Sequence, residues 1–232
     1  PMIDIRREIP LSVQCILDDI RSDSYLRYIL MLAVFTCGFG IWFRVPNFAG
    51  PDEYSRLIQP MKVAGRFVSD PGLASLQTAL TDGRALGASF YQYAIVLAPL
   101  FIFVVLTDQL EEFVSLGTIE SRWELWQAAP EWFWTSSILV GRLTSVILSV
   151  GCVYLTYRLG TEMKDRRVGR LAALLLALTM GFIGSSHVIG EDIPMLFLFL
   201  LSLLFVYRFV QTGHRRDFLL SCAGGALAIG FK

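Results

Sequence analysis

Two adjacent carboxylates, Asp52 and Glu53, follow directly after a long apolar run in the stretch NFAGPDEYSRL. A carboxylate in such a place can accept a proton during a reaction. It can also simply cap a helix, because acidic residues in a first turn complement the helix dipole. Cations on the same short segment favour the first reading, because together they could hold a phosphate at the level of lipid headgroups. These cations are Arg56, Lys62 and Arg66.

The segment that begins with this acidic pair, DEYSRLIQPMKVAGRF, also has an apolar face. Tyr54, Leu57, Ile58 and Met61 recur at helical spacing. This pattern predicts an amphipathic helix lying along a membrane surface.

A second constellation lies in SSHVIGEDIPMLF, which carries His187, Glu191 and Asp192 at the entrance to another apolar run. Ionisable residues in that position are a functional hypothesis by default. His187 and Glu191 are four residues apart and could bind a metal if the segment were helical. Two candidate ligands do not make a site, so no metal site is predicted and the need for a divalent cation stays open.

Arg142 is a solitary charge several residues inside an apolar run, in SSILVGRLTSV. Two roles stay open for it. Its side chain could extend outward to water as a plain anchor, or it could contact a lipid phosphate.

The elements that must position these residues are membrane helices. Hydrophobic residues make up 54% of the chain, charged residues make up 17%, and mean hydropathy is +0.56. This balance excludes an ordinary soluble domain. Lys plus Arg and Asp plus Glu are both 20, so the net charge gives no argument for a nucleic-acid partner. The four cysteines are scattered without C-x-x-C spacing, which suggests neither a disulfide framework nor a zinc site.

Apolar runs long enough to cross a bilayer predict an all-α, polytopic membrane protein. The expected spans are Tyr25 to Phe43, Thr135 to Tyr157, Val168 to Ser185 and Ile193 to Val210, with a fifth run starting near Phe218. That fifth run has no closing turn before Lys232, so we expect the chain to be a fragment of a longer protein.

Basic residues predict the orientation of these spans, because Lys and Arg concentrate on the cytoplasmic side. Arginines precede the first span, and two links between later spans, YRLGTEMKDRRVGR and YRFVQTGHRRD, are also basic. We therefore expect the N-terminal segment 1–24 and both links to be cytoplasmic. Both acidic pairs then share the extracytoplasmic side.

A further apolar run, Phe90 to Thr107, would reverse every later loop if it crossed the membrane fully. We predict that it is a re-entrant or half-buried helix. Residues 44–134 then form one large outer loop with interfacial helices, called the first loop below. The turn at residues 184–194 is called the second loop. Residues 25–232 form the transmembrane domain.

The order of these pieces resembles the GT-C superfamily of polyprenyl-phosphate-sugar-dependent glycosyltransferases, especially its protein O-mannosyltransferase and aminoarabinose transferase branch. The resemblance covers most of residues 41–232. It consists of a first span followed by DEYSR, then the stretch GRLTSVILSVGCVYLTYRLGTEMKDRRVGRLAALLLAL, and then SSHVIGEDIP. Each piece is degenerate alone, and their order and spacing give the resemblance its weight.

The resemblance implies an inverting transfer of a mannose-like sugar from a dolichyl or undecaprenyl phosphate carrier to a protein, glycan or lipid acceptor outside the cytoplasm. By position, Asp52 matches the catalytic acid of the family's first loop, with Glu53 beside it, and Asp192 matches the acid of its second loop. His187 falls on the family's Ser-His position. Together with it, we predict that Arg56, Lys62, Arg66, Arg142 and Glu191 bind the substrates. Such a site lies against the bilayer because the donor is a lipid.

The chain also departs from the family pattern. The stretch between Asp108 and Trp134 is longer and more acidic than the connection expected there, and Glu191 directly before Asp192 is not required. The alternative from another functional class is a secondary transporter or lipid-handling membrane protein, although transporters usually place ionisable residues near the bilayer midplane and show internal repeats. The expected location is a prokaryotic plasma membrane, with an archaeal origin as the working guess.

Overall fold

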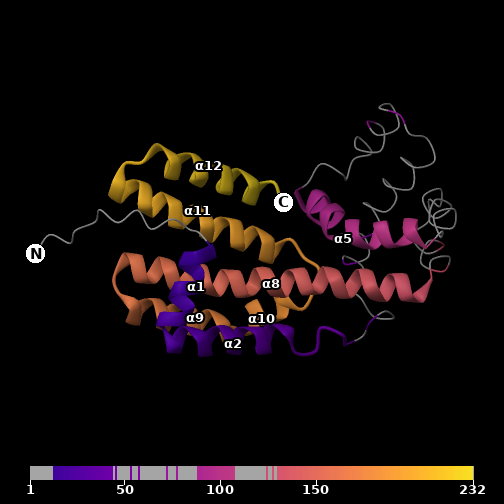
Figure 1. The fold of residues 1–232 in the computed structure, drawn as a ribbon, viewed down its shortest axis with the longest axis horizontal. Coiled ribbons are helices and arrows are strands. Elements are labelled where there is room, and N and C mark those ends of the chain that lie inside the picture. The colour runs from indigo at the N-terminus through magenta and orange to yellow at the C-terminus, as the bar shows by residue number, and fades with distance from the viewer. Residues whose placement is uncertain are drawn as a thin grey trace, which may run out of the picture. The chain divides into compact units, whose positions relative to one another are not determined.

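The computed structural model describes residues 13–43, 45, 53, 57, 72, 77, 88–107, 124, 127 and 130–231. Every regular element within this part of the chain is a helix, which confirms the predicted all-α class (Figure 1). The helices are α1 (Val13–Ser22), α2 (Ser24–Gly38), α5 (Ala88–Leu106), α8 (Glu131–Met163), α9 (Arg166–Ala177), α10 (Met180–Ser186), α11 (Asp192–Thr212) and α12 (Arg215–Ile229).

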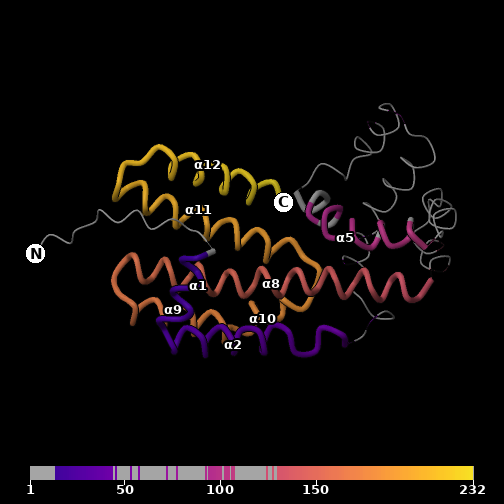
Figure 2. Tube along the Cα trace, in the orientation of Figure 1, coloured from indigo at the N-terminus to yellow at the C-terminus, as the bar shows by residue number. Residues whose placement is uncertain are grey.

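Two of these helices, α8 and α11, are long and apolar enough to cross a membrane. They confirm the predicted runs Thr135 to Tyr157 and Ile193 to Val210 as helices of spanning length. Figure 2 follows α8 as one uninterrupted helix of 33 residues, which is about 50 Å at 1.5 Å per residue. This length exceeds the roughly 30 Å of a hydrocarbon core.

The predicted span Val168 to Ser185 is not one straight helix. It is the pair α9 and α10, which bend by 64° at a break after Ala177 and count as a third span only if taken together. A broken helix leaves backbone carbonyls without helical partners. Thr36 of α2 hydrogen-bonds to one of these carbonyls, because its hydroxyl donates to the carbonyl oxygen of Ala177 at 3.4 Å.

The first predicted span, Tyr25 to Phe43, is also shorter than expected. Helix α2 has 15 residues and ends at Gly38. The chain then turns through Gly40, whose φ of 87° lies in the left-handed region that glycine adopts without strain.

The chain divides into two compact units. Unit 1 comprises Pro1–Phe39, Ile147–Ser185 and Ile193–Ala228, and unit 2 comprises Gly40–Val146, Ser186–Asp192 and Ile229–Lys232. Helix α8 contributes residues to both.

Asp23, between α1 and α2, organises the start of unit 1. Its carboxylate caps α2 by accepting the Leu26 N–H at 3.2 Å, and it also accepts from the Tyr157 hydroxyl and the Arg170 Nε, each at 2.9 Å. Burial alone would raise the pKa of Asp23, but the hydrogen bonds from Arg170, Leu26 and Tyr157 and the charge of Arg170 outweigh it and lower that pKa below its ordinary value. Asp23 therefore joins α2, α8 and α9 in its ionised form.

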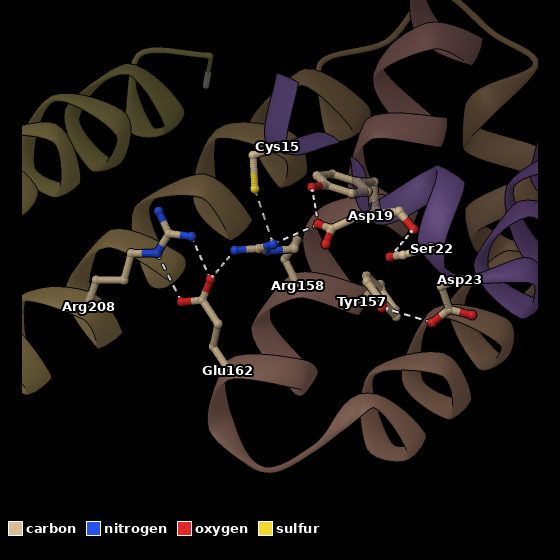
Figure 3. Close-up of polar contacts among 9 residues, drawn as sticks. Cys15, Asp19, Ser22, Asp23, Tyr157, Arg158, Glu162 and Arg208 are labelled. Atoms are coloured by element: carbon tan, nitrogen blue, oxygen red, sulfur yellow. Dashed lines mark hydrogen bonds and ion pairs between the residues drawn. The ribbon is translucent and has the colours of Figure 1, made fainter. Parts of the chain in front are cut away.

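A chain of alternating charges links α1, α8 and α11 (Figure 3). Arg158 NH1 donates to Asp19 Oδ2 at 2.6 Å, and Arg158 NH2 donates to Glu162 Oε1 at 2.8 Å. Glu162 in turn accepts from Arg208 Nε at 2.9 Å. Arg158 belongs to the link predicted to be cytoplasmic, and it is buried within unit 1, with 5% of its surface exposed.

Glycines let the helices of unit 1 approach closely. A Cβ built on Gly160 of α8 would lie 2.9 Å from the Cα of Gly169 in α9. One on Gly224 of α12 would lie 3.4 Å from the Leu198 carbonyl oxygen in α11.

Unit 2 brings α5 against the beginning of α8. The Phe103 and Trp132 rings meet edge to face with centroids 5.9 Å apart. The predicted helix at Phe90 to Thr107 is confirmed as α5, which contains Pro99, and its re-entrant placement in a membrane stays a prediction. Trp134, at the beginning of α8, is buried, with 1% of its surface exposed.

Candidate active site

The site is built on an ion pair between the first loop and α8. Arg142 donates two parallel hydrogen bonds to Glu53, from Nε to Oε1 and from NH2 to Oε2, each 2.9 Å long. The side chains are only 6% and 4% exposed. A bidentate guanidinium–carboxylate pair fixes orientation as well as distance, so Glu53 is held in one place.

The remaining guanidinium nitrogen of Arg142, NH1, binds the backbone just after α2. Its NH1 donates to the carbonyl oxygens of Ile41 at 2.7 Å and Phe43 at 3.0 Å. A guanidinium has five N–H donors, and four hydrogen bonds from Arg142 are now accounted for. Neither role considered from sequence, a water-facing anchor or a lipid-phosphate ligand, anticipated this engagement with protein groups.

Glu53 also holds the second loop. Its Oε1 accepts the backbone N–H of Ile189 at 2.9 Å. Next to that contact, the Ser145 hydroxyl of α8 donates to the carbonyl oxygen of Val188 at 3.1 Å. Two consecutive residues of the second loop are thus tied by their backbones, three residues before Asp192.

Apolar packing supports the same junction. Leu57, Leu97, Ile138 and Ile189 form one buried cluster, contributed by the first loop, α5, α8 and the second loop. Gly141 lets Ile189 lie against α8, because a Cβ there would be 2.6 Å from the Ile189 Cδ1. Glu53 and Leu57 are both helical and buried. The other members of the predicted apolar face, Tyr54, Ile58 and Met61, lie outside the described residues.

The other second-loop candidates lie beside this junction. Asp192 is the exposed first residue of α11, whereas His187 and Glu191 are half-buried. Residues 187–191 are not helical, so His187 and Glu191 do not meet the condition set for a helical metal pair. Within the described ranges no group of three or more His, Cys, Asp or Glu side chains is placed to hold a metal ion.

Four of the predicted site residues lie outside the described residues. These are Asp52, Arg56, Lys62 and Arg66. The described members of the predicted site are Glu53, Arg142, His187, Glu191 and Asp192, and all five belong to unit 2.

Sequence reasoning missed the partners of Glu53. A lone arginine inside an apolar helix usually pairs with an acid or with carbonyl groups, and this rule could have suggested the pairing of Arg142 with an acid of the first loop. The contacts at Ile189 and Ser145 had no sequence signal, since they depend on a backbone N–H and on a short hydroxyl side chain.

Residues 133–232 match the family described as dolichyl-phosphate-mannose-protein mannosyltransferase, which is of GT-C type. The predicted GT-C resemblance is confirmed over this part of the chain. The match includes Arg142, His187 and Asp192 and begins after the first-loop acids. It supports a membrane glycosyltransferase that uses polyprenyl-phosphate-linked mannose, in general terms. No curated protein and no solved structure matches the chain.

Proposed function

We propose that this chain carries the catalytic loops of an inverting mannosyltransferase that acts outside the cytoplasm. The donor is a mannose-like sugar on a polyprenyl phosphate. The acceptor is a hydroxyl group, and a protein acceptor is favoured over a glycan or lipid by the family that matches. The observation that carries the proposal is the contact of Glu53 with both Arg142 and Ile189, which joins the two acid-bearing loops.

In the proposed reaction the acceptor oxygen attacks the anomeric carbon opposite the phosphate. The new glycosidic bond forms as the bond from the sugar to the phosphate oxygen breaks, and the departing polyprenyl phosphate keeps the electron pair. Asp52 takes the acceptor's proton. Arg56, Lys62 and Arg66 stabilise the charge on the leaving phosphate.

Glu53 and Arg142 serve this reaction as a positioning pair. Both Glu53 oxygens already accept bonds from a guanidinium, so the role of proton acceptor falls to its neighbour Asp52. Through Ile189 the pair also fixes the second loop, where Asp192 orients the acceptor and His187 and Glu191 contact the substrates.

The test is transfer of labelled sugar from a polyprenyl phosphate donor in membranes that contain the full-length protein. Asp52→Asn should reduce transfer by about 100-fold or more, the usual range for a general base, with expression and thermal stability unchanged. Asp18→Asn is the control, because Asp18 is an exposed acid of α1, and it should match the wild type.

Two results would overturn the proposal. If Asp52→Asn transfers sugar as fast as the wild type, Asp52 is only a helix cap. If the wild type consumes no donor at all, the alternative of a transporter or lipid-handling protein replaces it.

A further inference from the structure

Unit 1 carries a surplus of exposed cations. In its described residues seven basic side chains are exposed, against two exposed carboxylates, Asp18 and Asp165. We call the seven the basic end. They are Arg21, Arg27, Lys164, Arg166, Arg167, Arg215 and Arg216.

Internal contacts bring these cations to one end of unit 1. The ion pair of Asp23 with Arg170 places the start of α2 beside the start of α9. The pair of Glu162 with Arg208 places the end of α11 beside the end of α8. The turns between α8 and α9 and between α11 and α12 accordingly lie at the same end of unit 1, on the left of Figure 1.

Three acids of this end are turned inward, and a fourth, Asp217, is half-buried. Asp19 and Glu162 are bound by Arg158 and Arg208 (Figure 3). Asp23 is bound by Arg170. Of the two exposed acids, Asp165 accepts the Val168 N–H as the cap of α9. The internal network therefore balances its own charges and leaves the exposed cations without an equal number of surface carboxylates.

The basic end also borders apolar and aromatic surface. Tyr25 and Tyr28 flank Arg27 and are 64% and 70% exposed. Phe218 and Leu219 follow Arg216 within one turn of α12 and are 49% and 65% exposed. Tyrosine next to cations, followed by exposed apolar side chains, is the pattern of the boundary between lipid headgroups and acyl chains.

We propose that the basic end binds the headgroups of anionic phospholipids in the leaflet that it faces. Charge complementarity favours anionic headgroups, since each Lys or Arg near an anionic bilayer surface strengthens binding about fivefold. The exposed apolar residues beside the cations suit a lipid rather than a soluble anion. This inference concerns a surface without a role in sugar transfer, so it stands or falls apart from the proposed function.

The experiment measures lipid retention by the purified full-length protein. The protein is exchanged into mixed micelles with equal amounts of phosphatidylglycerol and phosphatidylcholine, and bound lipids are counted by native mass spectrometry. The wild type should retain phosphatidylglycerol at least about threefold over phosphatidylcholine. The variant Arg166→Gln/Arg167→Gln/Arg215→Gln/Arg216→Gln, which keeps three of the seven cations, should show a clearly smaller preference for phosphatidylglycerol.

Asp18→Asn is the matched control, because it removes a negative charge from the exposed surface of the same unit. It should raise the preference for phosphatidylglycerol. The proposal is overturned if the wild type shows no preference for phosphatidylglycerol. It is also overturned if the variant with four substitutions keeps the full wild-type preference while its melting temperature is unchanged. Full displacement of phosphatidylglycerol by millimolar inorganic phosphate would also overturn it, because the basic end would then be a site for a free anion.

Discussion

Arg142 holds both carboxylate oxygens of Glu53 in a buried, two-bond ion pair, and the same carboxylate accepts the backbone N–H of Ile189. One acid thereby fixes three segments that are distant in sequence. The predicted catalytic loops depend on this pair for their place.

Breaking the pair from one side should destabilise the protein. Glu53→Gln leaves the Arg142 charge buried without compensation, which costs about 3 to 5 kcal/mol in comparable sites. The melting temperature in detergent should fall clearly, and Glu53→Gln/Arg142→Gln should recover part of the loss. Glu131→Gln, at the exposed first turn of α8, is the control and should cost less than about 1 kcal/mol. A double variant no better than Glu53→Gln would show that the two charges are not coupled.

The stability of unit 1 should depend on the charge of Asp23. Its pKa is lowered in the folded protein, so its ionised form stabilises the fold above the ordinary value of 3.8, and this contribution disappears as pH falls through the lower folded pKa. Asp23→Asn keeps a good helix cap but loses the charged bonds to Arg170 and Tyr157. It should be less stable than the wild type by about 1.5 to 3 kcal/mol at neutral pH.

The difference between the two should shrink as pH falls below 3.8, which unfolding curves at several pH values would measure. Asp165→Asn alters an acidic cap on the exposed surface and should have the smaller effect. A gap between wild type and Asp23→Asn that stays constant down to the lowest pH would contradict the assignment.

Glu162 should couple α8 to α11. Its carboxylate lies between Arg158 and Arg208, so Glu162→Gln leaves two arginines facing each other. A double-mutant cycle with Arg208→Gln should give a coupling energy of about 0.5 to 3 kcal/mol. Tyr207→Phe removes only the hydroxyl bond to the Glu162 carbonyl oxygen and should cost about 1 kcal/mol. Additive effects of Glu162→Gln and Arg208→Gln would rule the coupling out.

The contact between α8 and α9 should not tolerate a methyl group. A Cβ on Gly169 would lie 2.5 Å from the Tyr157 carbonyl oxygen, so Gly169→Ala forces the two backbones apart. We expect a loss of about 1 to 3 kcal/mol or more in thermal unfolding. Gly181→Ala in α10 meets nothing within 4 Å and should be neutral or slightly stabilising. Equal melting temperatures for the two alanine variants would contradict this packing.

Apolar runs were enough to predict α8 and α11, because a continuous stretch of such residues has few other stable conformations in a bilayer. The bend after Ala177 could not be predicted, since Leu178, Thr179 and Met180 include neither proline nor glycine. A contact from Thr36, far away in sequence, lies at that break.

The candidate site was also predicted only in part. The acids were identified by type and position, whereas the partner of Glu53 lies 89 residues away on another helix. No helix was predicted in the N-terminal segment 1–24, yet its residues from Val13 onward form α1, which the ion pair of Asp19 with Arg158 holds against α8. Pairings over such distances follow from tertiary structure and not from local pattern.

The separation of these partners also sets an order for biosynthesis. Glu53 leaves the ribosome 89 residues before Arg142, and Asp19 leaves it 139 residues before Arg158. Until α8 has been synthesised, neither carboxylate can form its ion pair with that helix. One helix thus brings the counter-charges for both the N-terminal segment and the first loop.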